Sequence, residues 1–213
     1  MGNSVYWAGD STVKSNNITT YPQTGIGQVM DLYFNKEVMV YNHAENGRST
    51  KSFIDEQRLA SIYNVLRPGD FLFIQFGHND AKFEDLTRHT EPFGDYQENL
   101  EKFVNVARNR QAYPVLITPV CRRWFSDNRF LDEDIHGDYP EAMLDLAERL
   151  SVPVIDLYKS SRNLIELKGP EDSRAYFVTS DNTHLVHQGA VAFAGLIAKG
   201  LKELGGIYTN LLI

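Results

Sequence analysis

Four short polar blocks in this chain carry residue types that can transfer an acyl group. They are Gly9–Thr12, Asn42–Ser49, Gly77–Asp80 and Asp181–His184. Each block alone has a plain structural explanation, because Gly-Asp-Ser and Asn-Gly sequences commonly form turns and Asp-x-x-His can cap a helix. Together, the blocks supply a nucleophile, a base, a carboxylate and donors for an oxyanion, which are the groups that acyl transfer requires.

The chemistry gives five of these residues a candidate role. Ser11 is the nucleophile, His184 the base that takes its proton, and Asp181 the carboxylate that fixes the tautomer of His184. The backbone N–H groups of Ser11 and Gly47, with the side-chain amide of Asn79, are the candidate oxyanion hole. Gly47 suits this role because a bare backbone can approach a substrate closely, and Asn79 because its amide donates without carrying charge.

A metal-binding interpretation competes for the same region. Asp181, His184 and His187 have the residue types of metal ligands. We favour the base role of His184, because no further cluster of ligands accompanies the three, and we therefore expect neither a metal nor another cofactor. The single cysteine, Cys121, excludes an internal disulfide and is expected to be a buried structural thiol.

Further residues beside these blocks could contact a substrate. Arg122, Arg123 and Trp124 follow a predicted strand, where an arginine can bind a carboxylate and an aromatic ring can stack on a sugar. A solvated loop with one packed aromatic ring explains them equally well. Arg48 could likewise either hold a loop in place or contact substrate. His78 could line the pocket or support its neighbour Asn79.

The elements that must position these residues follow from hydrophobic periodicity. Five short apolar runs without helical period are typical of strands covered on both faces: Val5–Ala8, Val38–Tyr41, Phe71–Phe76, Val115–Thr118 and Val152–Ile155. We expect helices near 26–34, 56–66, 96–110, 139–150, 157–167 and 188–204. Those at 56–66, 96–110, 139–150 and 188–204 carry an apolar stripe of helical period. Asp95 with Glu98, and Asp138 with Glu141, have the spacing of capping boxes.

Alternating strands and helices predict one α/β domain over residues 1–213, a three-layer α/β/α sandwich around a five-stranded parallel sheet. The long irregular stretches 77–94 and 119–137 are expected to be functional or mobile. In an open parallel sheet, ligands bind outside the carboxyl ends of the strands, and three of the four blocks directly follow predicted strands.

Charge and composition restrict the partners. The 213 residues carry a net charge of −7, which disfavours nucleic acid and anionic membranes as partners. No apolar run approaches the roughly 18 residues of a membrane span. Residues 1–8 lack the basic and apolar regions of a secretion signal, so we expect a cytoplasmic protein. Nothing in the sequence indicates an oligomeric state.

The four blocks, in this order, resemble the SGNH (GDSL-type) esterase family over essentially the whole chain. Gly47 with Phe53, the run 76–80, and Arg122 with Arg123 after Thr118–Val120 are closer to one branch, the rhamnogalacturonan acetylesterases. Thr12, where lipase-type members typically carry leucine, also favours the carbohydrate branch. The resemblance implies a flavodoxin-like sheet, no cofactor, and the removal of acetyl groups from pectin-derived sugars.

The expected partner is therefore an acetylated oligosaccharide, with Arg122, Arg123 and Arg48 supplying local positive charge for a uronate. Two alternatives stay open. An SGNH thioesterase or lysophospholipase would need an apolar acyl groove, and none can be assigned from the sequence. A non-catalytic glycan-binding module on the same fold would not need the complete set of Ser, Gly, Asn, Asp and His.

Overall fold

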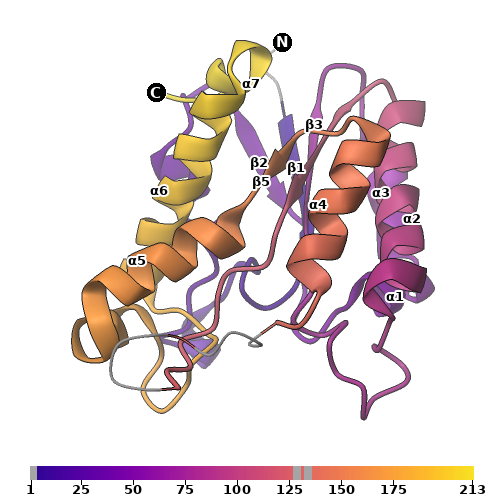
Figure 1. Ribbon diagram of the computed structural model, residues 1–213. Coiled ribbons are helices and arrows are strands. Elements are labelled where there is room, and N and C mark those ends of the chain that lie inside the picture. The colour runs from indigo at the N-terminus through magenta and orange to yellow at the C-terminus, as the bar shows by residue number, and fades with distance from the viewer. Residues whose placement is uncertain (1–3, 127–130, 132–135) are drawn as a thin grey trace.

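A sheet of five parallel strands forms the centre of the computed structural model, which describes residues 4–126, 131 and 136–213 (Figure 1). The strands are β1 (Ser4–Gly9), β2 (Met39–Asn42), β3 (Phe71–Gln75), β4 (Tyr113–Ile117) and β5 (Val154–Ile155). Their order across the sheet is β2-β1-β3-β4-β5, and every neighbouring pair is parallel. The predicted α/β fold with a five-stranded parallel sheet is confirmed.

Helices cover both faces of this sheet. One face packs against α1 (Thr50–Asp55), α2 (Arg58–Val65), α3 (Gln97–Asn109) and α4 (Tyr139–Leu150), and the other against α5 (Leu157–Asp172) and α6 (His187–Leu204), with α7 (Gly206–Thr209) after α6 (Figure 1). Strand residues alternate between the layers: Tyr6 faces α1–α4, whereas Val5 and Trp7 face α5 and α6. Burial on both faces explains why the strands are continuous apolar runs.

Most predicted boundaries agree with the structure to within two residues. The last predicted strand is shorter, because the Val152 N–H bonds to the Ala147 carbonyl at the end of α4 and Pro153 has no N–H to donate. Helix α5 runs past the predicted residue 167, across a non-helical Gly169. The expected loop at 119–137 includes 127–130 and 132–135, which lie outside the described residues.

The segment expected to be a helix at 26–34 instead forms two short 3₁₀ turns, Ile26–Gln28 and Met30–Leu32. It packs directly on the loop that follows β1, since a Cβ on Gly25 would lie 2.2 Å from the Lys14 carbonyl oxygen. Glycines at the start of the segment also weaken an α-helix. Ile26, Val29, Met30 and Phe34 of this segment are nevertheless buried in the core.

Neither expected capping box, at Asp95 or at Asp138, forms among the described residues. The Asp95 carboxylate accepts from the Glu91 N–H at 2.6 Å, and Asp138 precedes α4 without a side-chain bond to it. A capping box does occur at α1, where Ser49 and Ser52 bond reciprocally. It fixes the end of the loop that follows β2. Within the described ranges, no helix is long and apolar enough to cross a bilayer.

Candidate active site

The ends of three neighbouring strands bring the polar blocks to one edge of the sheet. Gly9 of β1 pairs with Gln75 of β3, and Trp7 of β1 pairs with Asn42 of β2, so the loops that follow emerge side by side. A cavity of about 430 Å³ opens there, against the loop before α6. Its described lining is Ser11, Gln23, Asn46, Gly47, His78, Asn79, Lys82, Arg122, Asp181, Thr183 and His184.

A chain of hydrogen bonds runs through Ser11, His184 and Asp181. The Ser11 Oγ lies 3.0 Å from Nε2 of His184, and Nδ1 of His184 lies 2.6 Å from Oδ2 of Asp181. Because an ionised carboxylate can only accept, Nδ1 carries the proton and Nε2 accepts from the serine hydroxyl. The structure thus joins the three residues expected to be nucleophile, base and carboxylate, with the imidazole in the tautomer that can take a proton from Ser11.

The loop before α6 holds the histidine and its carboxylate in place. The Val178 N–H donates to the His184 carbonyl and the Asp181 N–H to the Val178 carbonyl, both at 2.9 Å. Oδ1 of Asp181 accepts from the N–H groups of Thr183 and His184, at 2.6 and 2.9 Å. Burial alone would raise the pKa of Asp181, but the bonds from the His184 ring and these two N–H groups lower it below its usual value. Asp181 is therefore an anion at neutral pH.

The three candidate oxyanion donors line the same cavity. Within the described part of the chain, the N–H groups of Ser11 and Gly47 donate to no protein acceptor. Gly47 has φ +74°, a conformation that glycine adopts readily. The Asn79 amide donates to the Arg48 carbonyl at 3.1 Å, which leaves its second N–H available, and its oxygen accepts from Arg88 at 3.4 Å. Arg88 therefore fixes which way the Asn79 amide points.

Asp80 anchors the backbone next to Asn79. Its fully buried Oδ1 accepts from the Thr50 N–H at 3.0 Å, the Thr50 hydroxyl at 2.5 Å and the Thr90 hydroxyl at 3.1 Å. Burial raises the pKa of Asp80 to about 7, although these bonds oppose the rise. The carboxyl group thus ties the loop after β3 to the first turn of α1.

Arg48 and Arg123, both expected to contact substrate, have other partners. The Arg48 guanidinium binds Glu56 at 3.0 and 2.8 Å and so holds its own loop against the end of α1. Arg123 is 5% exposed and donates to the Ser173 hydroxyl at 3.0 Å and to the Pro170 carbonyl. These contacts place both guanidinium groups outside the cavity and assign them to loop structure.

Arg122 and His78 do line the cavity, whereas Trp124 does not. The Trp124 ring lies 5.3 Å from the Arg122 guanidinium and is 46% exposed beside a separate shallow hollow. Lys82 is a cavity residue that the sequence analysis missed. Burial, Arg88 and Arg122 lower the pKa of Lys82. A lone lysine in a polar loop gives no signal in the sequence by which its position could have been found.

The structure also shows the surroundings of the candidate metal ligands and of the single cysteine. Both ring nitrogens of His184 are engaged, and His187 is exposed at the start of α6. Across the described ranges, no group of three or more His, Cys, Asp or Glu side chains could hold a metal ion. Burial raises the pKa of Cys121 to about 12, so its thiol stays protonated.

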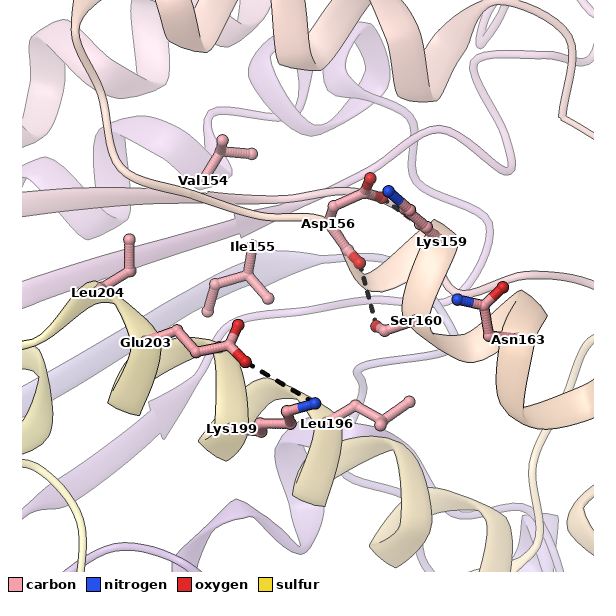
Figure 2. A pocket seen from close by; sticks show the side chains of 11 residues that line it. Val154, Ile155, Asp156, Lys159, Ser160, Asn163, Leu196, Lys199, Glu203 and Leu204 are labelled. Atoms are coloured by element: carbon pink, nitrogen blue, oxygen red, sulfur yellow. Dashed lines mark hydrogen bonds and ion pairs between the residues drawn. The ribbon is translucent and has the colours of Figure 1, made fainter.

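A second cavity, of about 460 Å³, lies between α5, α6 and β5 and shares no lining residue with the first (Figure 2). Lys199 pairs with Glu203 at 3.7 Å, and Asp156 accepts from the Lys159 N–H at 3.0 Å. The Ser160 hydroxyl donates to the Asp156 carbonyl rather than to a base. The described lining holds no histidine, so this cavity lacks a nucleophile with its base.

A parallel α/β/α sheet with a Ser–His–Asp hydrogen-bond chain at its carboxyl edge is typical of serine-dependent acyl hydrolases. The comparison with known families agrees with this class. The chain belongs to the GDSL-like lipase/acylhydrolase family, whose model matches residues 7–191, and it is a carboxylic ester hydrolase. The resemblance recognised in the four blocks is confirmed.

Individual relatives extend over nearly the whole chain. The rhamnogalacturonan acetylesterase RhgT of Bacillus subtilis is 42% identical over 94% of this chain and 90% of its own length. The probable rhamnogalacturonan acetylesterase YesY of the same organism is 41% identical over 96% and 95%. The crystal structure of B. subtilis YxiM superposes with a TM-score of 0.85 at 27% identity, covering 96% of this chain and 57% of that one.

Proposed function

We propose that this protein is an acetylesterase that removes O-acetyl groups from a carbohydrate, with rhamnogalacturonan as the substrate class. The observation that carries the proposal is the Ser11–His184–Asp181 chain in a cavity whose described lining is entirely polar or glycine. Such a cavity suits an acetyl group on a sugar, whereas the long acyl chain of a lysophospholipid would require apolar walls. The names of the relatives RhgT and YesY support the same substrate class.

In the proposed mechanism, Ser11 attacks the acetyl carbonyl carbon while Nε2 of His184 takes the hydroxyl proton. The tetrahedral oxyanion accepts from the N–H groups of Ser11 and Gly47 and from the Asn79 amide. The bond to the sugar oxygen then breaks, and His184 returns the proton to that oxygen. Water activated by His184 cleaves the acetyl-enzyme, which releases acetate and restores Ser11.

Hydrolysis rates on a panel of substrates test the substrate class, followed as acetate release from the acetylated glycans and as thiol release from the thioesters. The panel contains acetylated rhamnogalacturonan fragments, acetylated xylan, and short- and long-chain acyl thioesters. We expect the highest kcat/KM on the rhamnogalacturonan fragments. A preference for xylan would keep the assignment as an acetylesterase but change the glycan substrate. A preference for long-chain thioesters would contradict the proposed function.

Asn79→Ala is expected to reduce kcat by about 10²–10³-fold and to leave KM nearly unchanged. The reason is that the Asn79 amide would bind a negative charge that exists only after the serine has attacked. Initial rates on p-nitrophenyl acetate, with kcat and KM determined separately, measure the effect. A loss that falls mainly in KM would instead make Asn79 a residue that binds the substrate in its ground state.

Lys82 and Arg122 are proposed to bind a sugar carboxylate. Both line the cavity, and the Nε of Arg122 is buried without a partner among the described residues. Asp181 lines the same cavity, but its two carboxylate oxygens already accept from Thr183 and His184, so the two cations suit a further anion. Because the protein carries a net charge of −7, a uronate chain must be attracted by such local cations and not by the overall field.

Lys82→Gln is expected to lower kcat/KM on acetylated uronate oligomers by about tenfold, the lower end for a bond to a charged group. The loss should shrink as salt is added, because the site opens to solvent. It should be absent on p-nitrophenyl acetate, which has no carboxylate. Lys159→Gln, at an exposed lysine of the second cavity (Figure 2), is the matched control. Equal losses on both substrates would mean that Lys82 supports the fold.

A further inference from the structure

A second histidine–aspartate contact lies directly behind the proposed nucleophile. Nδ1 of His78 is 3.1 Å from Oδ2 of Asp10, and Nε2 of His78 is 3.0 Å from the Val120 carbonyl oxygen. The side chains of His78 and Asp10 are only 4% and 1% exposed. The mechanism above uses neither of them, although each immediately precedes a residue that it does use.

The contacts define which atoms of this pair donate and which accept. A carbonyl oxygen can only accept, so Nε2 of His78 carries a proton, and a further proton lies between Nδ1 and Oδ2. Oδ1 of Asp10 accepts from the N–H and the hydroxyl of Thr12, at 2.8 and 2.7 Å, which stabilises the carboxylate. Because a carboxylate can only accept, Nδ1 of His78 donates to Oδ2 of Asp10.

The groups around His78 leave Asp10 as the acceptor that faces its Nδ1. The His136 ring meets His78 edge-on at 4.8 Å, and its Nε2 accepts from the Arg122 N–H at 3.2 Å, which requires a neutral imidazole. Burial and the neighbouring His78 hold the pKa of His136 well below its usual value. Arg122 donates to the His78 carbonyl at 3.2 Å. Asp10 is thus the anion that directly faces the His78 ring.

A buried polar pair such as this one is seldom kept for stability, because losing hydration offsets most of the attraction and an apolar pair would do as well. Its position suggests another role. The ladder between β1 and β3 ends at the pair Gly9–Gln75, so the Asp10–His78 contact is a cross-link between the two loops just beyond it. One loop continues to Ser11 and the other to Asn79. The Val120 carbonyl adds the loop after β4 to the same histidine.

We propose that the buried Asp10–His78 hydrogen bond positions the nucleophile Ser11 relative to the oxyanion donor Asn79. The inference rests on the proposed function, since only an acyl transfer needs Ser11 and Asn79 at a fixed separation. Both are positioning residues that touch no reacting atom. An error of about 1 Å in such a separation can cost 10²-fold in rate, so a single rigid contact at this point has a measurable effect.

Two substitutions of His78 test its hydrogen bonds to Asp10 and to Val120 separately. In His78→Asn the side-chain N–H₂ takes the place of Nδ1 and can still donate to Asp10, whereas in His78→Gln it takes the place of Nε2 and can donate only to Val120. We expect His78→Gln to lower kcat on p-nitrophenyl acetate by about 10–10²-fold with KM within about twofold. His78→Asn should recover kcat to within about fivefold of the wild type. His187→Gln, at an exposed histidine, is the matched control and should leave both constants unchanged.

The outcomes distinguish this inference from the proposed function. Equal losses in the two His78 variants, a loss confined to KM, or wild-type kcat in His78→Gln would overturn the positioning role while Ser11→Ala still tests the triad. ¹⁵N NMR of the imidazole rings reports the protonation of each ring nitrogen in the wild-type protein, so this measurement does not depend on whether a variant folds. A proton on Nδ1 of His78 is expected, and an unprotonated Nδ1 would contradict the hydrogen bond to Asp10.

Discussion

Ser11→Ala is expected to reduce kcat on p-nitrophenyl acetate by at least about 10³-fold, down to the residual rate that binding and the oxyanion donors alone provide. The reason is geometric, because the Ser11 hydroxyl lies 3.0 Å from His184 Nε2, while the serine of the second cavity donates to a backbone carbonyl. Initial rates, with the melting temperature measured alongside, separate lost chemistry from lost folding.

Ser160→Ala is the matched control for this variant and is expected to keep full activity. A serine-reactive phosphonate gives an independent readout, since mass spectrometry of the labelled protein should locate the adduct on Ser11. An active Ser11→Ala protein, or an adduct on Ser160, would contradict the assignment of the nucleophile (Figure 2).

The residues proposed to do the chemistry could be predicted because each lies next to a feature that sequence patterns reveal. Ser11, Gly47 and Asn79 follow apolar strands, and in a parallel sheet such residues meet at one edge. Asp181 and His184 lie on one loop, where Asp181 bonds both the ring and the backbone of His184. Local spacing and strand order were therefore enough to bring the five together.

The roles of the arginines could not be predicted in the same way, because their partners are set by tertiary structure. Arg123 donates to Ser173, fifty positions along the chain, and no local pattern marks that contact. Arg48 binds Glu56, across a helix, α1, that was not predicted. The same holds for Arg88, which reaches the Asn79 amide from a loop without regular structure.

The segment 26–34 shows a second limit of sequence patterns. Its apolar residues Ile26, Val29, Met30 and Phe34 recur as they would on a helix, and they are buried in the core. Periodicity gives no information about the loop after β1, which packs closely against Gly25. Apolar spacing thus identified the buried residues, while backbone crowding decided that they form 3₁₀ turns.

Asp181→Asn is expected to reduce kcat by about 10⁴-fold at neutral pH, an effect as large as losing the nucleophile. The asparagine oxygen can keep the bonds from the N–H groups of Thr183 and His184, so the loop should hold its shape. The amide nitrogen then takes the place of Oδ2, and it can only donate. It therefore favours the His184 tautomer without a proton on Nδ1, in which Nε2 is protonated.

A protonated Nε2 donates to Ser11 instead of accepting from it, so the base is lost although every side chain stays in place. Unchanged KM and melting temperature together with the fall in kcat would identify this tautomer effect. Asp138→Asn, at an exposed carboxylate before α4, is the matched control and should keep its activity. If Asp181→Asn kept more than about a tenth of the wild-type kcat, far above the loss expected from a wrong tautomer, Asp181 would merely shape the loop.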